Sequence, residues 1–440
     1  MSKSFRRLSM IVLIFLLALG NGTVQPARAR TSAIFDVNST ADLNDDILNS
    51  VCSVGSSHGG PCTLRGAIAE ANAIAASMDV TINIPSGTYD LTIAPVGVNG
   101  ITSGDLDLPD PNPGYWIRLV GTGAQPAVID ANQLDRLFDI GLDVNIQMEN
   151  IVIKGGLLSW TGTADFHDGA GILNLGTLML NRVVIEENEA RCGQETCVFN
   201  ISGGGILNVG MMTIVDSTIR NNKSVAASAI AHAGSGMMFI KNSTIYGNQA
   251  EAFVIDSYAH LHIRNSTISG NTAAPAYIAG IRNNHTLIVE SSTFANPGRI
   301  SSIYNTSGST VTIHDSILRN TPVGGSDNCF NSGTWNSDGY NIYSDNTCPA
   351  TGIGDVINTD PLLGTLGYWG GYTMTMPLQT GSPARNNRPG NCINIPENPV
   401  VPVILEEDQR HYPRSDGNCD TGAFEGVMDV SQFFLPIIFR

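Results

Sequence analysis

Four charged or titratable side chains recur at matching positions of a repeat and could act together on a ligand. Lys241, Arg264, Glu290 and His314 are separated by 23, 26 and 24 residues. In a stack of repeats they would form one lateral stripe, which could bind an acidic sugar or supply the base of a polysaccharide lyase. The alternative, which we favour, is a solvated face with a cross-strand Arg264–Glu290 ion pair.

A glycosidase would instead need two carboxylates about 5–9.5 Å apart across a cleft. Stacked repeats could supply them at one outward position of neighbouring units. One outward column holds Glu149, Asn181, Val215, Lys241, Arg264, Glu290 and His314. The other holds Gln147, Met179, Thr213, Phe239, His262, Ile288 and Thr312. Neither places carboxylates on adjacent units, so we predict no catalytic residue; a site in loops around 105–110 or 157–168 stays open.

Two acidic clusters carry the oxygen donors that a hard metal ion such as Ca²⁺ prefers. The stretch DLNDD at 42–46 begins like a calcium-binding loop, but Ile47 stands where such a loop has glycine. Asp105, Asp107 and Asp110 form the second cluster. The GGxGxD calcium repeat is absent from the sequence. We therefore expect both clusters to be polar loops, and we predict neither a metal nor a cofactor.

The elements that must position these side chains are short strands in a repeat. An apolar anchor recurs at Ile153, Ile185, Ile219, Ile245, Ile268, Phe294 and Leu318. The residues seven positions earlier are Ile146, Leu178, Met212, Met238, Leu261, Leu287 and Val311. Those five positions earlier are Met148, Leu180, Ile214, Ile240, Ile263, Val289 and Ile313. Because side chains alternate along a strand, the two earlier columns lie on one face.

Polar residues mark where each repeat unit bends. Three positions before the anchors stand Asn150, Arg182, Asp216, Asn242, Asn265, Ser291 and Asp315. Short polar side chains of this kind bond to nearby backbone and favour bends. Three positions after four of the anchors stand Asn188, Asn222, Asn248 and Asn271, which suit a turn with left-handed backbone. Each unit is therefore expected to be strand, bend, strand and turn.

One such unit cannot bury its apolar face, whereas stacked units can. Variable spacing between constant strands favours a parallel β-helix with insertions at one corner. A β-sandwich is the rival fold, but its strands would not repeat one register over seven units. Leucine-rich repeats are excluded because their LxxLxLxxN pattern is absent. Residues 80–91 and 116–132 suit further coils without the same frame, so coils are expected from about Val80 to about Ser344.

Composition and the N-terminus indicate an exported β protein. Charged residues make up 14% of the chain, Gly numbers 47 and the net charge is −16, which argues against nucleic acid as a partner. Basic residues precede an apolar run from Met10 to Leu19, followed by Ala27-Arg28-Ala29, a pattern typical of a signal peptide cleaved after Ala29. An uncleaved membrane anchor is the alternative. No later segment has the length and apolarity of a membrane span.

Eight cysteines fit an oxidising compartment. They pair by proximity in the sequence, and we expect four disulfides: Cys52–Cys62, Cys192–Cys197, Cys329–Cys348 and Cys392–Cys419. A zinc site is the alternative, but the chain has no CxxC pair to support it. We therefore expect no free thiol in the oxidised protein.

Three stretches resemble known families of exported proteins. They are CTLRGAIAEANA at 62–73, the repeats GAGILN at 169–174 and GGGILN at 203–208, and the C-terminal motifs at 360–387, 408–414 and 419–425. The first is similar to the signature of the CSLREA domain, the second to polymorphic outer-membrane-protein repeats and the third to the choice-of-anchor Q domain. The resemblance implies an all-β, right-handed parallel β-helix, commonly surface-attached, without an established reaction. Arg385 departs from it, because an acidic residue usually follows GSPA.

The CSLREA-like stretch also departs from its family pattern. In that signature Ser and Glu form a helix capping box, whereas here Thr63 can still cap but Gly66 replaces the Glu. A short apolar stripe remains at Leu64, Ile68, Ala71 and Ala75. We expect a short helix that covers the open end of the coil stack.

The expected organisation has five parts. They are a signal peptide over 1–29, a CSLREA-like cap over 30–79, the β-helix over 80–345, a choice-of-anchor Q-like region over 346–425 and an apolar tail over 426–440. We predict an exported, non-catalytic protein, secreted or at the cell surface, that serves adhesion or binds surface glycans or envelope components. The alternative is a carbohydrate-active lyase or hydrolase that uses a lateral groove.

Overall fold

The computed structural model describes twelve stretches of the chain. They are residues 32–45, 47–54, 59–96, 100–109, 114–160, 168–193, 202–273, 279–296, 301–320, 327–394, 403–414 and 417–426. The expected signal peptide and nearly all of the expected C-terminal tail lie outside these residues. Within them, no helix is both long and apolar enough to cross a membrane.

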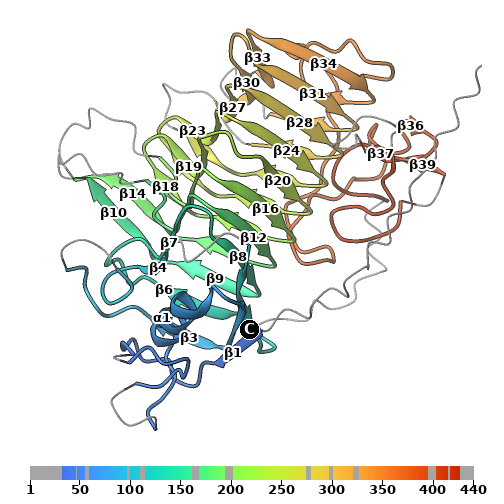
Figure 1. Ribbon diagram of the computed structural model, residues 1–440. Coiled ribbons are helices and arrows are strands. Elements are labelled where there is room, and N and C mark those ends of the chain that lie inside the picture. Colours follow the sequence, from blue (N-terminus) through green and yellow to red (C-terminus); the bar gives the residue numbers. More distant parts are fainter. Residues whose placement is uncertain are drawn as a thin grey trace, which may run out of the picture. The chain divides into compact units, whose positions relative to one another are not determined.

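Four parallel sheets run along a stack of coils (Figure 1). Sheet 1 has eleven strands in the order β1 (Ser32–Asp36), β2 (Asp79–Ile84), β5 (Trp116–Gly121), β8 (Asn145–Glu149), β12 (Thr177–Asn181), β16 (Met211–Val215), β20 (Met238–Lys241), β24 (His260–Arg264), β28 (Thr286–Glu290), β31 (Thr310–His314) and β34 (Thr334–Gly339). Sheet 2 has ten, in the order β3 (Gly87–Asp90), β6 (Ala127–Asp130), β9 (Ile151–Lys154), β13 (Val184–Glu186), β17 (Thr218–Arg220), β21 (Thr244–Tyr246), β25 (Thr267–Ser269), β29 (Thr293–Ala295), β32 (Ile317–Leu318) and β35 (Ile342–Tyr343).

The remaining strands complete the coils and a C-terminal region. Sheet 3 runs from β4 (Leu106–Leu108) through β7 (Phe138–Ile140), β11 (Ile172–Asn174), β15 (Ile206–Asn208), β19 (Ala227–His232), β23 (Phe253–Ser257), β27 (Ala279–Asn283) and β30 (Ser301–Asn305) to β33 (Cys329–Asn331). Sheet 4 contains β10 (Leu157–Trp160), β14 (Glu189–Cys192), β18 (Lys223–Ser224), β22 (Gln249–Ala250) and β26 (Thr272–Ala273). Two antiparallel pairs follow, β36 (Arg388–Pro389) with β39 (Asn418–Cys419), and β37 (Ile393–Asn394) with β38 (Val403–Ile404).

The three apolar columns of the repeat form the core of the stack. Ile153, Ile185 and Ile219 are direct neighbours in sheet 2, and the anchor register continues unbroken to Leu318. The two earlier columns pair in the same unbroken way in sheet 1. Every member of the three columns is at most 2% exposed. Burial of such columns is the main stabilising contribution to the fold, at about 25 cal/mol per Å² of apolar surface.

The two early segments join this frame, contrary to the expectation from the sequence. Val80 and Ile117 continue the column of Ile146, and Ile129 continues the column of Ile153. The corner between β5 and β6 is five residues longer than the corresponding corner in later units. This insertion changes the spacing along the chain without changing the register between strands, so the spacing of apolar residues does not reveal the shared frame.

The bends use left-handed backbone at a different column from the one predicted. The seven residues three positions before the anchors, from Asn150 to Asp315, all have positive φ, between 44° and 55°. The asparagines three positions after the anchors do not; the residue before each of them does. These asparagines are instead buried in a ladder, in which each side-chain amide donates to the amide oxygen of the next, from Asn188 to Asn296.

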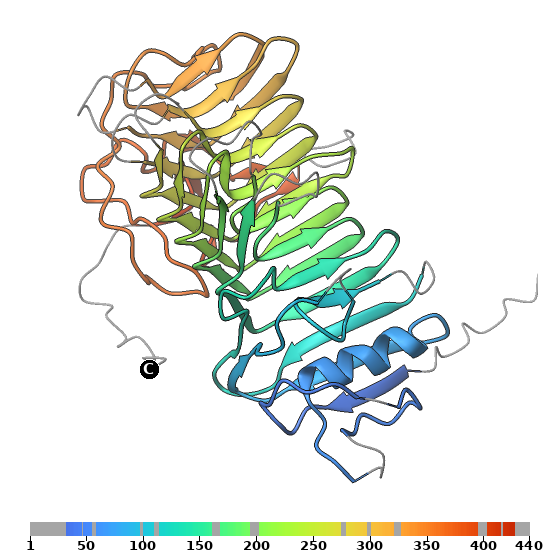
Figure 2. The ribbon, with the colours of Figure 1, turned by 90° about the vertical axis from the view of Figure 1, so that its left-hand side faces the viewer.

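The helix α1 (Leu64–Ile74) lies at the N-terminal end of the coils, as expected (Figure 2). The Thr63 side chain accepts a hydrogen bond from the Gly66 amide, which caps the first turn. Leu64, Ile68 and Ala71 are buried, and the helix contacts β2 and β4. The predicted capping residue and apolar stripe are therefore confirmed.

The C-terminal region packs against the corner between sheets 1 and 2. The Gln409 side chain donates to Thr244 Oγ1 at 2.9 Å and accepts from Thr267 Oγ1 at 2.6 Å. Arg414 donates to the side chain of Asn265 at 3.1 Å, and the same guanidinium is ion-paired with Glu425. These contacts reach β21 and β25 of sheet 2 and the bend residue Asn265, and so fix the region along the corner between sheets 1 and 2.

Candidate functional site

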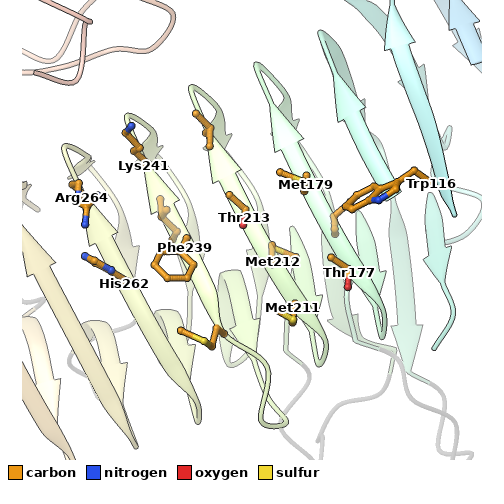
Figure 3. A pocket seen from close by; sticks show the side chains of 14 residues that line it. Trp116, Thr177, Met179, Met211, Met212, Thr213, Phe239, Lys241, His262 and Arg264 are labelled. Atoms are coloured by element: carbon orange, nitrogen blue, oxygen red, sulfur yellow. The ribbon is translucent and has the colours of Figure 1, made fainter. Parts of the chain in front are cut away.

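A groove of about 430 Å³ crosses the outward face of sheet 1, over β5, β12, β16, β20 and β24 (Figure 3). Most of its lining comes from the outward positions of these strands, and the core residues Leu178, Met212 and Ile240 lie at its floor. The apolar part is made by Trp116, Met179, Met211, Met237 and Phe239. Met179 is 40% and Met211 52% exposed, which is unusual for such large apolar side chains on a sheet surface. An apolar surface rimmed by polar groups is typical of a binding site.

Positive charge gathers at one end of the groove. Lys241 and Arg264 are direct neighbours on β20 and β24, and His262 lies beside the Phe239 ring, with 5.3 Å between the ring centroids. None of the described lining residues is a carboxylate. The groove therefore suits an anionic ligand, although the net charge of the chain is −16.

Behind the cationic end lies a buried ion network centred on Glu290. Its carboxylate accepts hydrogen bonds from His262 Nε2 at 2.7 Å, from Arg264 Nε and from His314 Nε2 at 3.1 Å. The side chain of Glu290 is fully buried. Burial alone would raise the pKa of this carboxyl, but hydrogen bonds from the two histidines hold the pKa well below its usual value.

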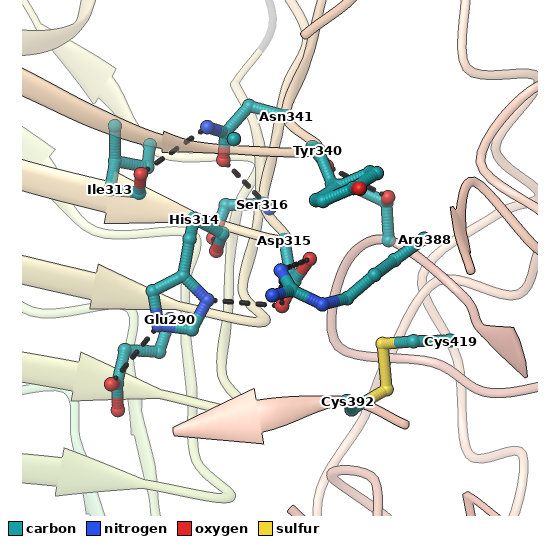
Figure 4. Close-up of polar contacts among 12 residues, drawn as sticks. Glu290, Ile313, His314, Asp315, Ser316, Tyr340, Asn341, Arg388, Cys392 and Cys419 are labelled. Atoms are coloured by element: carbon teal, nitrogen blue, oxygen red, sulfur yellow. Dashed lines mark hydrogen bonds and ion pairs between the residues drawn. A yellow bond between two sulfur atoms is a disulfide. The ribbon is translucent and has the colours of Figure 1, made fainter. Parts of the chain in front are cut away.

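The network continues to the C-terminal region (Figure 4). His314 Nδ1 lies 3.0 Å from Asp315 Oδ2, and Arg388 donates to both Asp315 oxygens at 3.0 and 3.1 Å. Burial would lower the pKa of His314, but hydrogen bonds to Asp315 and Glu290 raise the pKa to about 9. Both ring nitrogens face carboxylates, so His314 is an imidazolium at neutral pH.

The four residues of the predicted stripe therefore divide into two groups. Lys241 and Arg264 line the groove, and the Arg264–Glu290 ion pair is confirmed. The prediction of a solvated face is wrong for Glu290 and His314, which are at most 1% exposed. Their opposite charges and complete hydrogen bonding make burial tolerable. His262 belongs to the other outward column, which gave no candidate residue; its place one strand from Glu290 and two residues out of register with it was a usable signal.

The charge of His314 predicts a loss of stability at alkaline pH. Its pKa is raised above the unfolded value of about 6.5, so its stabilising contribution is complete below that pH and disappears as pH rises through about 9. We expect a decrease in the free energy of unfolding on the order of 3 kcal/mol over this range. Urea unfolding at pH 6.5 and 9 measures it, and His314→Gln should flatten the profile; an unchanged profile in that variant would contradict the assignment.

The two acidic clusters have different structures. Asp42 pairs with the buried Arg65 and accepts from the amides of Thr92 and Ile93. Asp42, the first residue of DLNDD, thus connects its own loop to Arg65 of α1 and to the loop at residues 92–93. Asp105 is not in an exposed polar loop, because α1 packs against the adjacent β4 and Asp105 is fully buried. Asp110 lies outside the described residues.

Three of the four expected disulfides are present: Cys52–Cys62, Cys329–Cys348 and Cys392–Cys419. Cys192 is also disulfide-bonded, while Cys197, its expected partner, lies outside the described residues. No cysteine in the described part of the chain is free. The Cys329–Cys348 bond lies next to the last coils, since Cys329 opens β33.

Comparison with known proteins supports the fold. The family model of the right-handed β-helix region matches residues 202–353. Among solved structures the chain is similar to that of pectate lyase Pel9A, with 14% identity and a TM-score of 0.44, over 90% of this chain and 97% of that chain. Curated proteins give no significant match. The match to the family model, together with the parallel register of the four sheets, confirms the right-handed parallel β-helix predicted from the sequence.

Proposed function

We propose that this chain is an exported β-helix protein that binds an acidic polysaccharide in the groove of sheet 1. The observation that carries the proposal is the combination of exposed apolar side chains with Lys241 and Arg264, and without a carboxylate among the described lining residues. Phe239, Trp116 and the methionines offer surfaces for the apolar faces of sugar rings. Lys241, the exposed cation, can pair with a carboxylate of a polymer that runs along the stack, whereas Arg264, on the next strand ~4.8 Å away, is already ion-paired with Glu290 and adds positive potential beside it.

Binding is tested by replacing the exposed cation. Lys241→Ala should weaken binding of polygalacturonate or alginate about fivefold, because one partly solvated ion pair contributes about 1 kcal/mol. Lys241→Glu should weaken it further, and raising the salt concentration should weaken binding of the wild type. Isothermal titration with defined oligosaccharides measures these changes.

A matched control is Lys223→Ala, which removes an exposed lysine from β18 in sheet 4. This variant should bind like the wild type. Neutral polysaccharides such as amylose should bind weakly to all variants. Equal affinity of wild type and Lys241→Ala, or equal binding of neutral and acidic polymers, would refute the groove as the acidic-polysaccharide site.

A second candidate function, a polysaccharide lyase, is favoured by one contact. His262 lines the groove and is hydrogen-bonded to Glu290 beside Arg264, and a histidine oriented by a carboxylate is a common general base. A glycoside hydrolase has less support, because the described groove offers no pair of carboxylates. Release of unsaturated ends from polygalacturonate, abolished in His262→Gln, would establish the lyase. Binding without any release of new ends supports the non-catalytic function.

The domain organisation and the cellular location belong to the same proposal. A CSLREA-like cap over 30–79 is supported by the capped helix α1, and a choice-of-anchor Q-like region over 346–425 by its packing along the coil edge. Disulfides fit an extracellular protein, secreted or at the cell surface, with a role in adhesion or envelope contact. Mass spectrometry of the exported protein tests cleavage after Ala29; an intact N-terminus would contradict it.

A further inference from the structure

Three carboxylates meet at the N-terminal end of sheet 3. Asp107 on β4 and Asp139 on β7 are direct neighbours in the parallel register, and Asp105 immediately precedes β4. One carboxylate oxygen of each residue lies within 4.8 Å of the others. Figure 1 shows β4 and β7 side by side at this end of the coil stack. The sequence does not predict that Asp139 joins this cluster, because it lies 32 positions after Asp107.

The hydrogen bonding of this cluster is incomplete. Asp105 is fully buried, and neither of its carboxylate oxygens accepts a hydrogen bond from any described residue. One carboxylate oxygen of Asp107 is likewise buried and accepts no hydrogen bond from a described residue. The amide nitrogen of Asn72 donates to the Asp107 carbonyl at 2.9 Å, while its amide oxygen is buried without a donor. Buried carboxylates are normally fully hydrogen-bonded, so these oxygens indicate a missing positive partner.

The nearby guanidinium groups do not balance the charge. Arg136 Nη1 is 2.8 Å from Asp139 but 3.7 Å from Asp105, beyond hydrogen-bonding distance. Arg65 is ion-paired with Asp42 and donates to the carbonyl of Asp105, not to its carboxylate. Burial, and then the charge of Asp107, raise the pKa of Asp105 to about 8, which expresses the same imbalance. The carboxylates of Asp105, Asp107 and Asp139, together with that of the nearby Asp135, thus share Arg136 as their main positive neighbour.

We propose that Asp105, Asp107 and Asp139 bind a calcium ion. All donors are oxygens, and the described cluster includes no histidine or cysteine, so softer metals are disfavoured. Mg²⁺ is usually held by one or two carboxylates and keeps most of its water, whereas three carboxylates around a buried position suit Ca²⁺. The ion would join β4 to β7. Through Asn72 and Arg65 it would also fix α1 to the first coils.

Calcium titration of the full chain, freed of metal by a chelator, tests this site. In physiological salt with excess Mg²⁺ we expect one Ca²⁺ per chain, with a Kd of about 10⁻⁴–10⁻³ M, as in extracellular modules. Asp105→Asn and Asp139→Asn should each weaken binding at least tenfold. Asp90→Asn is the matched control, since Asp90 is an exposed acid on β3 in the same coils, and it should bind like the wild type.

A stability measurement separates a lost site from a lost fold. Without Ca²⁺, Asp105→Asn should unfold at a temperature no lower than the wild type, because it removes a buried carboxyl group whose oxygens accept no hydrogen bond from a described residue. Calcium should raise the unfolding temperature of the wild type and of Asp90→Asn but not of Asp105→Asn. No calcium binding by the wild type would overturn the proposal. So would equal loss in all three variants, or affinity that survives in both Asp105→Asn and Asp139→Asn.

Discussion

Ile245→Asp is expected to lower the free energy of unfolding by about 5 kcal/mol and to leave little folded protein. Ile245 is 1% exposed and stacks between Ile219 and Ile268 in the anchor column. An aspartate there would lose the apolar contacts of isoleucine and bury a charge with no partner. Because each coil is supported only by its neighbours, the damage also weakens the coils above and below.

Urea unfolding followed by circular dichroism measures this loss. Two control variants distinguish the effect of the introduced charge from the effect of changing a buried position. Ile245→Val should cost only about 1 kcal/mol, since it removes one methyl group. Gln249→Asp, at an exposed position of β22 in the same coil, should change stability by about 0.5 kcal/mol or less. A stable Ile245→Asp protein would mean that the anchor column does not form the core.

The register of the β-helix could be predicted because it depends on local alternation. Inward side chains must be apolar in every unit, so Ile245 and its equivalents show the same frame wherever the corner length is constant. Coils are predicted correctly for residues 80–91 and 116–132, but not their shared frame, because the long corner after β5 shifts the spacing while the strand pairing stays the same. Left-handed backbone is predicted for Asn222 and its equivalents because asparagine tolerates positive φ. The structure gives these asparagines a different role, since their side chains form the buried amide ladder.

The polar interior could not be predicted in the same way. An outward position on a strand is exposed only if nothing packs over it, and packing depends on segments far away in the sequence. Glu290 and His314 occupy such positions, yet their network extends to Arg388 in the C-terminal region. Asp105 and Asp107 became neighbours of Asp139 through strand pairing at the end of sheet 3. Residue types alone do not specify either arrangement.

Glu290→Gln is expected to destabilise the protein by about 3 kcal/mol at neutral pH. Glu290 accepts from His262, Arg264 and His314, and all three partners are donors. Glutamine offers one acceptor oxygen and would turn its own N–H groups toward at least one of these donors. The substitution keeps the shape of the side chain, so the loss reports the missing negative charge among buried cations.

Glu149→Gln provides a control in the same outward column. Glu149 is ion-paired with Arg182, but both side chains are more than a quarter exposed, so the loss should be about 1 kcal/mol or less.

The two variants should also differ in pH dependence. The pKa of Glu290 is depressed, so its contribution is complete above the unfolded pKa of about 4.3 and is lost as pH falls. The deficit of Glu290→Gln should therefore shrink below pH ~4. A deficit that is equally small in both variants at neutral pH would show that the charge of Glu290 does not stabilise the buried network.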